Sequence, residues 1–283
     1  MMKGSPVANL DFETIKFEQR GKTACITLSR PHALNSISIE MMKELAVAYA
    51  HVEESDDIWT LIITGEGRAF CTGADISMIH NTHIDGKPTG IDLWGEPILS
   101  SYRQWDPPQE ATPPYQTMTK PVICALNGIA AGAGLDILTT SDIAIAAEDV
   151  TLFDPHVSIG LVSGREMVRM ARVLPLNITM RMALMGKHDR LTAQRAYDLG
   201  LISELTPKDK LMERAWEIAE IVNSNAPLAV RGTRMGIRKG LELPVYQAEL
   251  LAESYRIRVA QTKDGEEGTQ AFLDKRKPVW RCE

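Results

Sequence analysis

The chain has 283 residues, of which 44% are hydrophobic and 24% charged, a profile that allows a large packed core without disulfide staples. Its net charge of −6, with no basic stripe, argues against nucleic acid as the main partner. The four cysteines form no CxxC pair, and no apolar run approaches the length of a membrane span. The first residues have no signal-like apolar core, so we expect a cytoplasmic protein with reduced thiols and no membrane partner.

The N-terminal part of the chain predicts two strands, a helix and a further strand, in that order. Two β-rich runs at 12–19 and 24–28 are separated by a short Gly-Lys turn, which is typical of a hairpin. Over 39–52 the apolar residues recur at helical spacing. Residues 59–64 form another β-rich run, which a Gly-Glu-Gly sequence ends.

A similar pattern recurs further along the chain. Residues 121–126 read as a buried strand, followed by a Gly/Ala-rich loop over 127–134 and a helix over 135–141. Further strands are expected at 142–147 and 151–153. Recurrent strand–strand–helix units indicate an α/β protein in which helices pack outside the sheets.

After about residue 163 helical patterns replace the strands. One of these helices should begin after the N-cap Thr192 and end before Gly200. We therefore divide the chain into a core domain over 10–205 and a helical C-terminal region over 206–283, which we expect to pack on the core or on a neighbouring subunit. The predicted helices cover 164–173, 177–186, 192–199, 208–223, 227–239, 244–262 and 264–274.

Residues 81–118 interrupt the core domain with broken periodicity and six prolines. A long segment of this kind is usually a functional lid or a disordered loop, and its aromatic residues favour an ordered wall. We expect a lid-like insertion whose aromatic side chains shape a pocket for an acyl group bulkier than a short linear chain; they are Trp94, Tyr102, Trp105 and Tyr115.

Two strand-to-helix turns consist of small residues that leave backbone N–H groups uncovered. The first spans 68–76 and the second 127–136. Uncovered N–H groups at a helix start can hold an oxyanion or a phosphate. The plainer interpretations are a tight turn with Gly73 at positive φ and a helix start capped by Asp136. Neither turn is a dinucleotide fingerprint or a P-loop, because the GxGxxG and GK[ST] spacings are missing.

Taken together, the two turns and several later segments resemble the crotonase (enoyl-CoA hydratase/isomerase) superfamily over residues 12–277. The resemblance implies a crotonase-like spiral of repeated ββα units, a helical C-terminal oligomerisation region and an acyl-CoA thioester substrate. The segments that carry it are Phe-Cys-Thr-Gly-Ala-Asp-Ile at 70–76, Lys-Pro-Val-Ile-Cys-Ala-Leu-Asn-Gly at 120–128 with the Gly/Ala run after it, Ser-Asp-Ile-Ala-Ile-Ala at 141–146, 159–162, 191–202 and 268–277.

By motif position, the resemblance implies that the backbone N–H groups of Ala74 and Ala133 hold the thioester oxygen. Fixed donors of this kind act most strongly when negative charge develops on that oxygen in the transition state. Family members usually have glycine at the second position. The methyl group of Ala133 should therefore narrow the site or require a negative φ there.

Family hydratases place two glutamates around the α and β carbons of the substrate. By position the first falls on Asp136, which is one methylene shorter. Counting back from Gly160, the second falls on His156, whereas counting forward from Phe153 would reach Val157; we prefer His156. A histidine can act as a general base or acid near neutral pH, although a hydrogen-bonded loop histidine is the plainer interpretation.

Three further residues near His156 enter the analysis. Asp154 is a second candidate carboxylate in the same loop, and Gly164 falls where family hydratases use a backbone group to hold the water. The alternation Asp154, His156, Ser158 suggests a catalytic triad. We expect no such triad, because residues at period-2 spacing cannot easily meet in one relay.

The resemblance also implies how coenzyme A is bound. The nucleotide should contact the backbone near Ala33 and the turn at Asp75 and Ile76, and a neighbouring subunit should contribute Phe272 and Lys275. A solvated surface charge is the alternative for Lys275. The expected assembly is a homotrimer or a dimer of trimers.

The function we expect is hydration of an enoyl-CoA, with no cofactor, because coenzyme A is part of the substrate. An isomerase or an acyl-CoA hydrolase on the same site is one alternative, and a CoA-binding family member without efficient catalysis is another. His80 and His83 have a spacing compatible with a metal, but no third ligand is identifiable, so we expect no metal.

Overall fold

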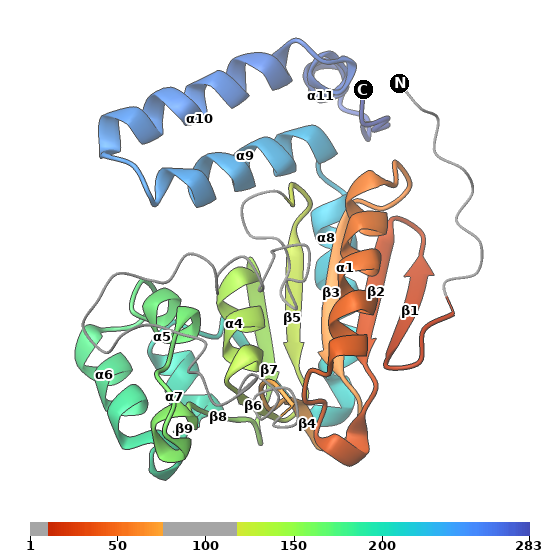
Figure 1. Ribbon diagram of the computed structural model, residues 1–283. Helices are drawn as coiled ribbons and strands as arrows, with labels where there is room; N and C mark the ends of the chain where they lie inside the picture. Colours follow the sequence, from red (N-terminus) through yellow and green to blue (C-terminus); the bar gives the residue numbers. More distant parts are fainter. Residues whose placement is uncertain (1–10, 76–117) are drawn as a thin grey trace, which may run out of the picture.

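The computed structural model describes residues 11–75 and 118–283, and this part of the chain is an α/β fold with two β-sheets (Figure 1). The larger sheet has the strand order β1-β2-β3-β5-β7-β10. β1 and β2 pair antiparallel, and the remaining neighbours pair parallel. Its strands are β1 (Ile15–Arg20), β2 (Thr23–Leu28), β3 (Thr60–Gly65), β5 (Val122–Leu126), β7 (Ile143–Ala147) and β10 (Glu204–Thr206).

The smaller sheet has the order β4-β6-β8-β9, with β9 antiparallel to β8 and the other pairs parallel. It is formed by β4 (Ala69–Cys71), β6 (Ile129–Ala131), β8 (Thr151–Phe153) and β9 (Leu191–Thr192). The chain alternates between the sheets: β3, β5 and β7 each add a strand to the larger sheet, and β4, β6 and β8 follow them into the smaller one. This alternation is the predicted spiral of repeated units.

Helices cover the sheets and build the C-terminal region. α8 packs across one face of the larger sheet against β2, β3, β5 and β7, while α1 and α4 lie on the other face (Figure 1). The helices are α1 (Ile39–Glu54), α4 (Ala133–Thr140), α5 (Arg165–Met170), α6 (Leu176–Met185), α7 (Ala193–Asp198), α8 (Leu211–Asn223), α9 (Pro227–Gly240), α10 (Val245–Ala260) and α11 (Lys263–Leu273). Short 3₁₀ turns are η1 (Pro31–Ala33), η3 (His156–Ile159), η4 (Gly186–His188) and η5 (Lys208–Lys210).

The core lies between the larger sheet and its covering helices. β5 is buried along its whole length, which explains why its sequence is continuously apolar rather than alternating. α1 begins at Ser38, whose hydroxyl accepts a hydrogen bond from the Met41 N–H, and buries its apolar side on the sheet. The covering helices thereby hold the larger sheet in place.

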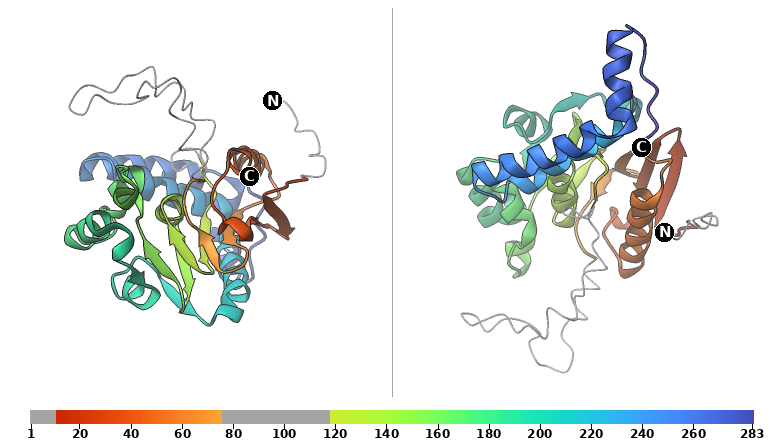
Figure 2. Two further views of the ribbon diagram at one scale, coloured as in Figure 1. Left: turned by 60° about the horizontal axis from the view of Figure 1, so that its bottom comes forward. Right: turned by 90° about the horizontal axis from the view of Figure 1, so that it is seen from above.

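The C-terminal helices form a separate layer. α9 and α10 run side by side as a hairpin (Figure 1), α10 lies outermost in the view from above (Figure 2, right), and no residue of α10 is buried. Asp142, just before β7, ties this layer to the core. Its carboxylate accepts hydrogen bonds from Arg234 Nε at 2.6 Å and Arg238 Nε at 2.8 Å, both on α9, and from the Val122 N–H at 2.8 Å.

The predicted elements agree with the structure in kind and differ at short strands. The hairpin, the helix of residues 39–52 and the three C-terminal helices are confirmed. Thr192 accepts a hydrogen bond from the Arg195 N–H at the start of α7, and Gly200 has a φ of 79°, as expected of the two ends. The loop predicted over 127–134 instead contains β6, and β4 was not predicted, because three-residue strands are too short to show a periodicity.

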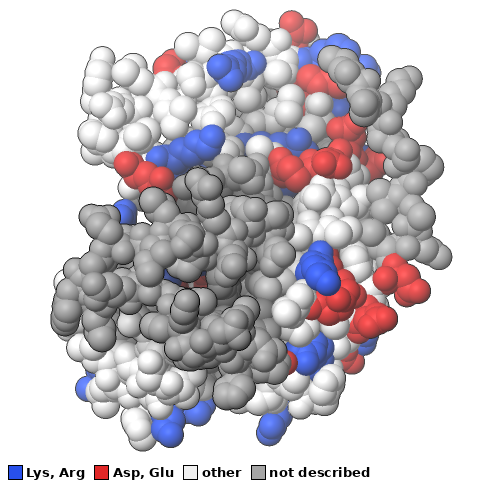
Figure 3. Space-filling model, in the orientation of Figure 1, with Lys and Arg blue, Asp and Glu red and all other residues white. Residues whose placement is uncertain are grey.

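The molecular surface carries charges of both signs. On the face drawn in Figure 3, Lys and Arg side chains stand next to Asp and Glu side chains rather than in a stretch of one sign. Within 11–75 and 118–283, no helix is long and apolar enough to cross a membrane. The expected lid-like insertion over 81–118, with its four aromatic residues, lies outside the described residues except for Met118.

Asp142→Ala should destabilise the protein by about 3–5 kcal/mol, because it leaves two largely buried arginines without their shared carboxylate. Equilibrium denaturation in urea measures this loss. Asp149→Ala is the matched control: it removes an exposed ion pair with Lys208 and should cost less than about 1 kcal/mol. Equal losses in the two variants would contradict the anchoring role of Asp142.

Candidate active site

Two backbone turns meet at the carboxyl ends of neighbouring parallel strands. β4 pairs with β6 through Cys71 and Ala130, so the turn after β4 and the turn after β6 leave the small sheet at the same edge. Their main chains nearly touch: a Cβ placed on Gly132 would lie 3.2 Å from Gly73 Cα. Ligands of open α/β sheets bind at such edges.

The Ala74 N–H points away from its local partner strand. Ala74 forms an isolated parallel bridge with Ile37, in which the Ile37 N–H donates to Gly73 O and the Asp75 N–H donates to Ile37 O, both at 2.9 Å. This pattern uses the groups on either side of Ala74 and leaves its own N–H on the opposite side. Within the described residues, nothing accepts a hydrogen bond from it.

The Ala133 N–H is a second unused donor. Ala133 is the first residue of α4, where no earlier turn supplies a carbonyl. Among residues 11–75 and 118–283 no acceptor takes this N–H, and the helix start adds partial positive charge. Two N–H groups without an acceptor in the described residues therefore lie at neighbouring turns, and their role in holding a thioester oxygen stays a prediction.

The methyl group of Ala133 is accommodated by the glycine before it. Gly132 has φ 52° and ψ −121°, a conformation that L residues rarely adopt, whereas Ala133 is already helical with a negative φ. The departure from the usual glycine thus costs no backbone strain. Gly134 is needed for a different reason: a Cβ there would lie 2.3 Å from Cys71 O, at the end of β4.

Asp136 is a buried carboxylate one turn into α4. Its exposed fraction is 1%, and Oδ1 accepts a short hydrogen bond from Arg169 Nη1. Arg165 Nη2 lies 3.8 Å from Oδ2, and Oδ2 is buried without a hydrogen-bond partner. Both arginines come from α5, so this carboxylate joins α4 to α5 rather than capping its own helix.

His156 is held by Asp154. The Nδ1 atom of His156 lies 2.5 Å from Asp154 Oδ1, and the same oxygen accepts the His156 backbone N–H at 3.0 Å. Asp154 is fully buried, and its other oxygen accepts a short hydrogen bond from Ser163 Oγ. The three side chains form a connected group that ends at the imidazole ring.

These contacts shift both pKa values. Burial raises the pKa of Asp154, but hydrogen bonds from His156 and Ser163 outweigh it, so that the pKa lies below its ordinary value. The hydrogen bond to Asp154 raises the pKa of His156 against the opposing effect of burial, and the charges of Asp154 and Glu166 add to the rise. The carboxylate is therefore ionised, and the imidazole is a stronger base than usual.

The expectation about a triad was half right. Ser158 is not part of the group, because its hydroxyl instead accepts a hydrogen bond from the Lys187 N–H at 2.9 Å. Asp154 and His156 do pair, contrary to the argument from period-2 spacing. The chain turns into η3 at Pro155, so the alternation of an extended strand does not apply to these residues. The hydroxyl that donates a hydrogen bond to Asp154 belongs to Ser163 instead.

The imidazole lies beside the start of α4. A Cβ placed on Gly132 would be 3.6 Å from His156 Cε1, next to the Ala133 donor. Asp136 follows Gly132 by four residues and so lies on the same side of α4. The structure thus brings together Ala74, Ala133 and His156, with Asp136 one helical turn away.

Gly164 is the N-cap of α5, two residues before Glu166. A Cβ at Gly164 would lie 3.7 Å from Glu166 Oε2, so the glycine is next to a side chain whose charge acts on His156. Its predicted role in holding a water molecule stays a prediction.

The predicted coenzyme A contacts fall into two groups. Ala33 in η1 and Asp75 are both bound to Arg30: the Ala33 N–H donates to Arg30 O at 3.0 Å, and Arg30 Nη2 is 3.1 Å from Asp75 Oδ2. Ile76 lies outside the described residues, as do His80 and His83.

Phe272 and Lys275 belong to the other end of the molecule. They lie at the end of α11, which Figure 1 draws far from β4. The phenyl ring is on the surface, with Phe272 83% exposed. One chain therefore does not bring these two residues to the turns.

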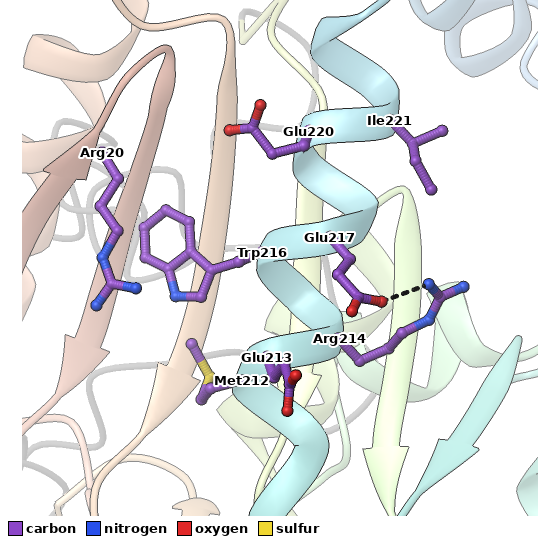
Figure 4. Close-up of a pocket in the computed structure, with 8 residues that line it drawn as sticks. All are labelled: Arg20, Met212, Glu213, Arg214, Trp216, Glu217, Glu220 and Ile221. Atoms are coloured by element: carbon purple, nitrogen blue, oxygen red, sulfur yellow. Dashed lines mark hydrogen bonds and ion pairs between the residues drawn. The ribbon is translucent and has the colours of Figure 1, made fainter.

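A surface hollow between β1 and α8 offers no comparable chemistry (Figure 4). The guanidinium of Arg20 stacks over the Trp216 ring at 4.4 Å and pairs with Glu18. Arg214 on the same helix is paired with Glu217 and Glu204. Both arginines of this hollow are paired with neighbouring side chains, whereas His156 and Asp136 lie at the start of α4.

Sequence reasoning did not find Ser163, Arg165 and Arg169. The sequence signal was present but weak: Ser163 and Arg165 flank Gly164 at a helix start, and Arg165 and Arg169 have the i,i+4 spacing of one helix face. Nothing in that spacing identifies Asp136 as their partner. The contact depends on how α5 packs against α4.

The profile of the enoyl-CoA hydratase/isomerase family matches residues 18–283. The chain belongs to this family. Among curated relatives, the enoyl-CoA hydratase EchA19 of Mycobacterium tuberculosis is 31% identical over 269 residues, 92% of this chain and 94% of that protein. The short-chain-enoyl-CoA hydratase of Clostridium acetobutylicum is 28% identical over 276 residues, 95% of this chain and 97% of that protein.

Solved structures of family members have the same fold. The enoyl-CoA hydratase/isomerase from Mycobacterium paratuberculosis is 56% identical, with a TM-score of 0.84 over 96% of this chain and 99% of that one. The enoyl-CoA hydratase from Bacillus anthracis is 28% identical, with a TM-score of 0.81 over 96% of this chain and 100% of that one. The predicted crotonase fold is therefore confirmed.

Gly134→Ala should lower turnover of an enoyl-CoA on the order of 10²–10³-fold, because the added methyl pushes the start of α4 and its N–H donor away from β4. Steady-state kinetics measures the loss. Gly232→Ala on α9 is the control; its Cβ meets only side chains, at 3.3 Å and beyond, and activity should be kept. Full activity in Gly134→Ala would show that donor placement at Ala133 is unimportant.

Proposed function

We propose that this protein is an enoyl-CoA hydratase that adds water across the α,β double bond of an enoyl-CoA thioester. The observation that carries the proposal is the pair of unused N–H donors at Ala74 and Ala133 beside a histidine that Asp154 makes more basic. The names of the family relatives support the same activity.

In the proposed mechanism the thioester oxygen accepts hydrogen bonds from the Ala74 and Ala133 N–H groups. An electron pair of the water oxygen forms the bond to Cβ, and the electrons of the double bond move toward the thioester oxygen. The resulting enolate carries its negative charge where the two donors point. Because these donors are fixed by the backbone, they need no reorganisation during the reaction.

His156 and Asp136 act on the water. Nε2 of His156 accepts one water proton and afterwards returns it to Cα, so that the imidazole is neutral again after each turnover. Asp136 is held in place by its ion pair with Arg169, and its Oδ2, which forms no hydrogen bond in the described residues, accepts one from the other water hydrogen. Gly164 would help to hold the same water through its backbone.

Coenzyme A would enter past Ala33 and the turn at Asp75 and Ile76. We propose that Phe272 and Lys275 reach it from a neighbouring subunit of a homotrimer or a dimer of trimers. The unburied helix α10 and the exposed apolar residues of this region, which include Tyr246 at 70% and Phe272 at 83%, support burial in an assembly. The proposed reaction needs no separate cofactor and fits a cytoplasmic enzyme.

The direct test is incubation of the purified protein with trans-2-enoyl-CoA thioesters of several chain lengths and shapes, followed by mass spectrometry. The expected product is heavier than the substrate by one water and keeps its thioester. Release of free coenzyme A would point to a hydrolase, and a shifted double bond of unchanged mass to an isomerase. Tight binding with no product would leave a CoA-binding protein and overturn the proposal.

The pH dependence follows from the shifted histidine. The base form of His156 is neutral, so kcat/KM should fall as the pH drops through its pKa. Since that pKa is raised from its ordinary value of 6.5, the midpoint of the acid limb should lie above pH 6.5. Initial rates across the pH range measure it, and a midpoint below 6.5 would contradict this role for His156.

A further inference from the structure

The carboxylate of Asp154 is both buried and hydrogen-bonded at each of its oxygens. Its side chain has no exposed surface, and burying an ionised carboxylate is costly unless hydrogen bonds compensate. Compensation here comes from the His156 backbone N–H, His156 Nδ1 and Ser163 Oγ. Both carboxylate oxygens are engaged, so the plane of the carboxylate is fixed from two sides.

This arrangement fixes the orientation of the imidazole. One oxygen of Asp154 binds both the backbone and the ring of His156, so the ring cannot turn without losing a hydrogen bond. An ionised carboxylate accepts only, which places the neutral ring's proton on Nδ1 and leaves the lone pair on Nε2. In the described part of the chain, no group forms a hydrogen bond with Nε2.

The ring lies beside the start of α4 through Cε1. His156 Cε1, which lies between the two ring nitrogens, is next to Gly132 and therefore next to the Ala133 donor. Asp154 is bound at Nδ1, so Nε2 is the nitrogen next to Cε1 that has no hydrogen-bond partner in the described residues. A proton taken by Nε2 at the substrate is thus stabilised by a negative charge that never touches the substrate.

We propose that Asp154 is a positioning residue for this reaction: it holds Nδ1 of His156 so that Nε2 alone exchanges protons with water and Cα, and Ser163 holds Asp154 in turn. The proposal rests on the proposed hydratase function. Asp154 itself exchanges no proton; the water proton moves to Nε2 and from there to Cα, as in the mechanism above.

Other charged groups around His156 do not provide this contact. The charge of Glu166 on α5 raises the pKa of His156 by less than Asp154 does. Asp136 on α4 forms an ion pair with Arg169. α6 and η4 also pack against η3; Arg181 is paired with Asp189, and the remaining charged residues of these elements, Lys187 and His188, are exposed.

The decisive variant is Asp154→Asn. An amide can donate to Nδ1 and so move the ring proton to Nε2, where the base is needed. We expect kcat to fall on the order of 10²–10⁴-fold with KM within about threefold, because substrate contacts are untouched. Asp149→Asn, an exposed aspartate paired with Lys208, is the matched control and should behave as the wild type.

A second measurement separates positioning from a merely structural role and does not depend on turnover. The rate of His156 modification by diethyl pyrocarbonate, followed by peptide mass spectrometry across pH, reports its titration. The midpoint should move to lower pH in Asp154→Asn and, by a smaller amount, in Ser163→Ala, while the Asp149→Asn control keeps the wild-type midpoint.

The outcomes distinguish the two claims. An unchanged midpoint in Asp154→Asn, or a raised KM with unchanged kcat, would overturn the positioning role. If the wild type hydrates no enoyl-CoA and the midpoint still shifts, the hydratase function fails while the hold of Asp154 on His156 is supported. Should Asp154→Asn not fold, the smaller downward shift in Ser163→Ala carries the test, and its absence overturns the proposal.

Discussion

The close approach of two backbone turns is the constraint on which this structure depends. Gly73 and Gly132 come from turns almost 60 positions apart in the chain, yet a Cβ on Gly132 would lie 3.2 Å from Gly73 Cα. The pairing of β4 with β6 sets this distance. It thereby places the N–H groups of Ala74 and Ala133 at neighbouring turns. Because the proposed mechanism uses main-chain groups to bind the oxygen, side chains matter here mainly through their small size.

In the proposed mechanism the proton chemistry comes from a second group of residues, on α5 and the loop before it. The loop gives Asp154, His156 and Ser163, and α5 gives the arginines that pair with Asp136. The two carboxylates thereby take different tasks. In the proposed mechanism Asp154 holds the base, while Asp136 uses the oxygen that forms no hydrogen bond in the described residues. By the proposed motif positions, a histidine with its own carboxylate and a shorter, ion-paired acid stand where family hydratases have two glutamates.

Much of the fold and of the two turns could be predicted from the sequence, because these features depend on residues close together in the chain. The long helices, the apolar strands and the small residues of both turns are each visible in a window of about ten residues. The three-residue strands β4 and β6 were missed, since they are defined by their partners. The Asp136–Arg169 pair spans 33 positions and depends on helix packing. The Asp154–His156 pair was misjudged for a different reason: a 3₁₀ turn breaks the extended geometry that the spacing suggested.

The central claim is that two backbone donors polarise a thioester carbonyl. Isotope-edited infrared spectroscopy of an enoyl-CoA labelled with ¹³C at the thioester carbon observes that bond directly when the ligand is bound to the protein. The account predicts a carbonyl stretch at lower frequency than in free solution, because hydrogen bonds to the oxygen weaken the double bond. A frequency equal to that of the free thioester, at saturating protein, would contradict it.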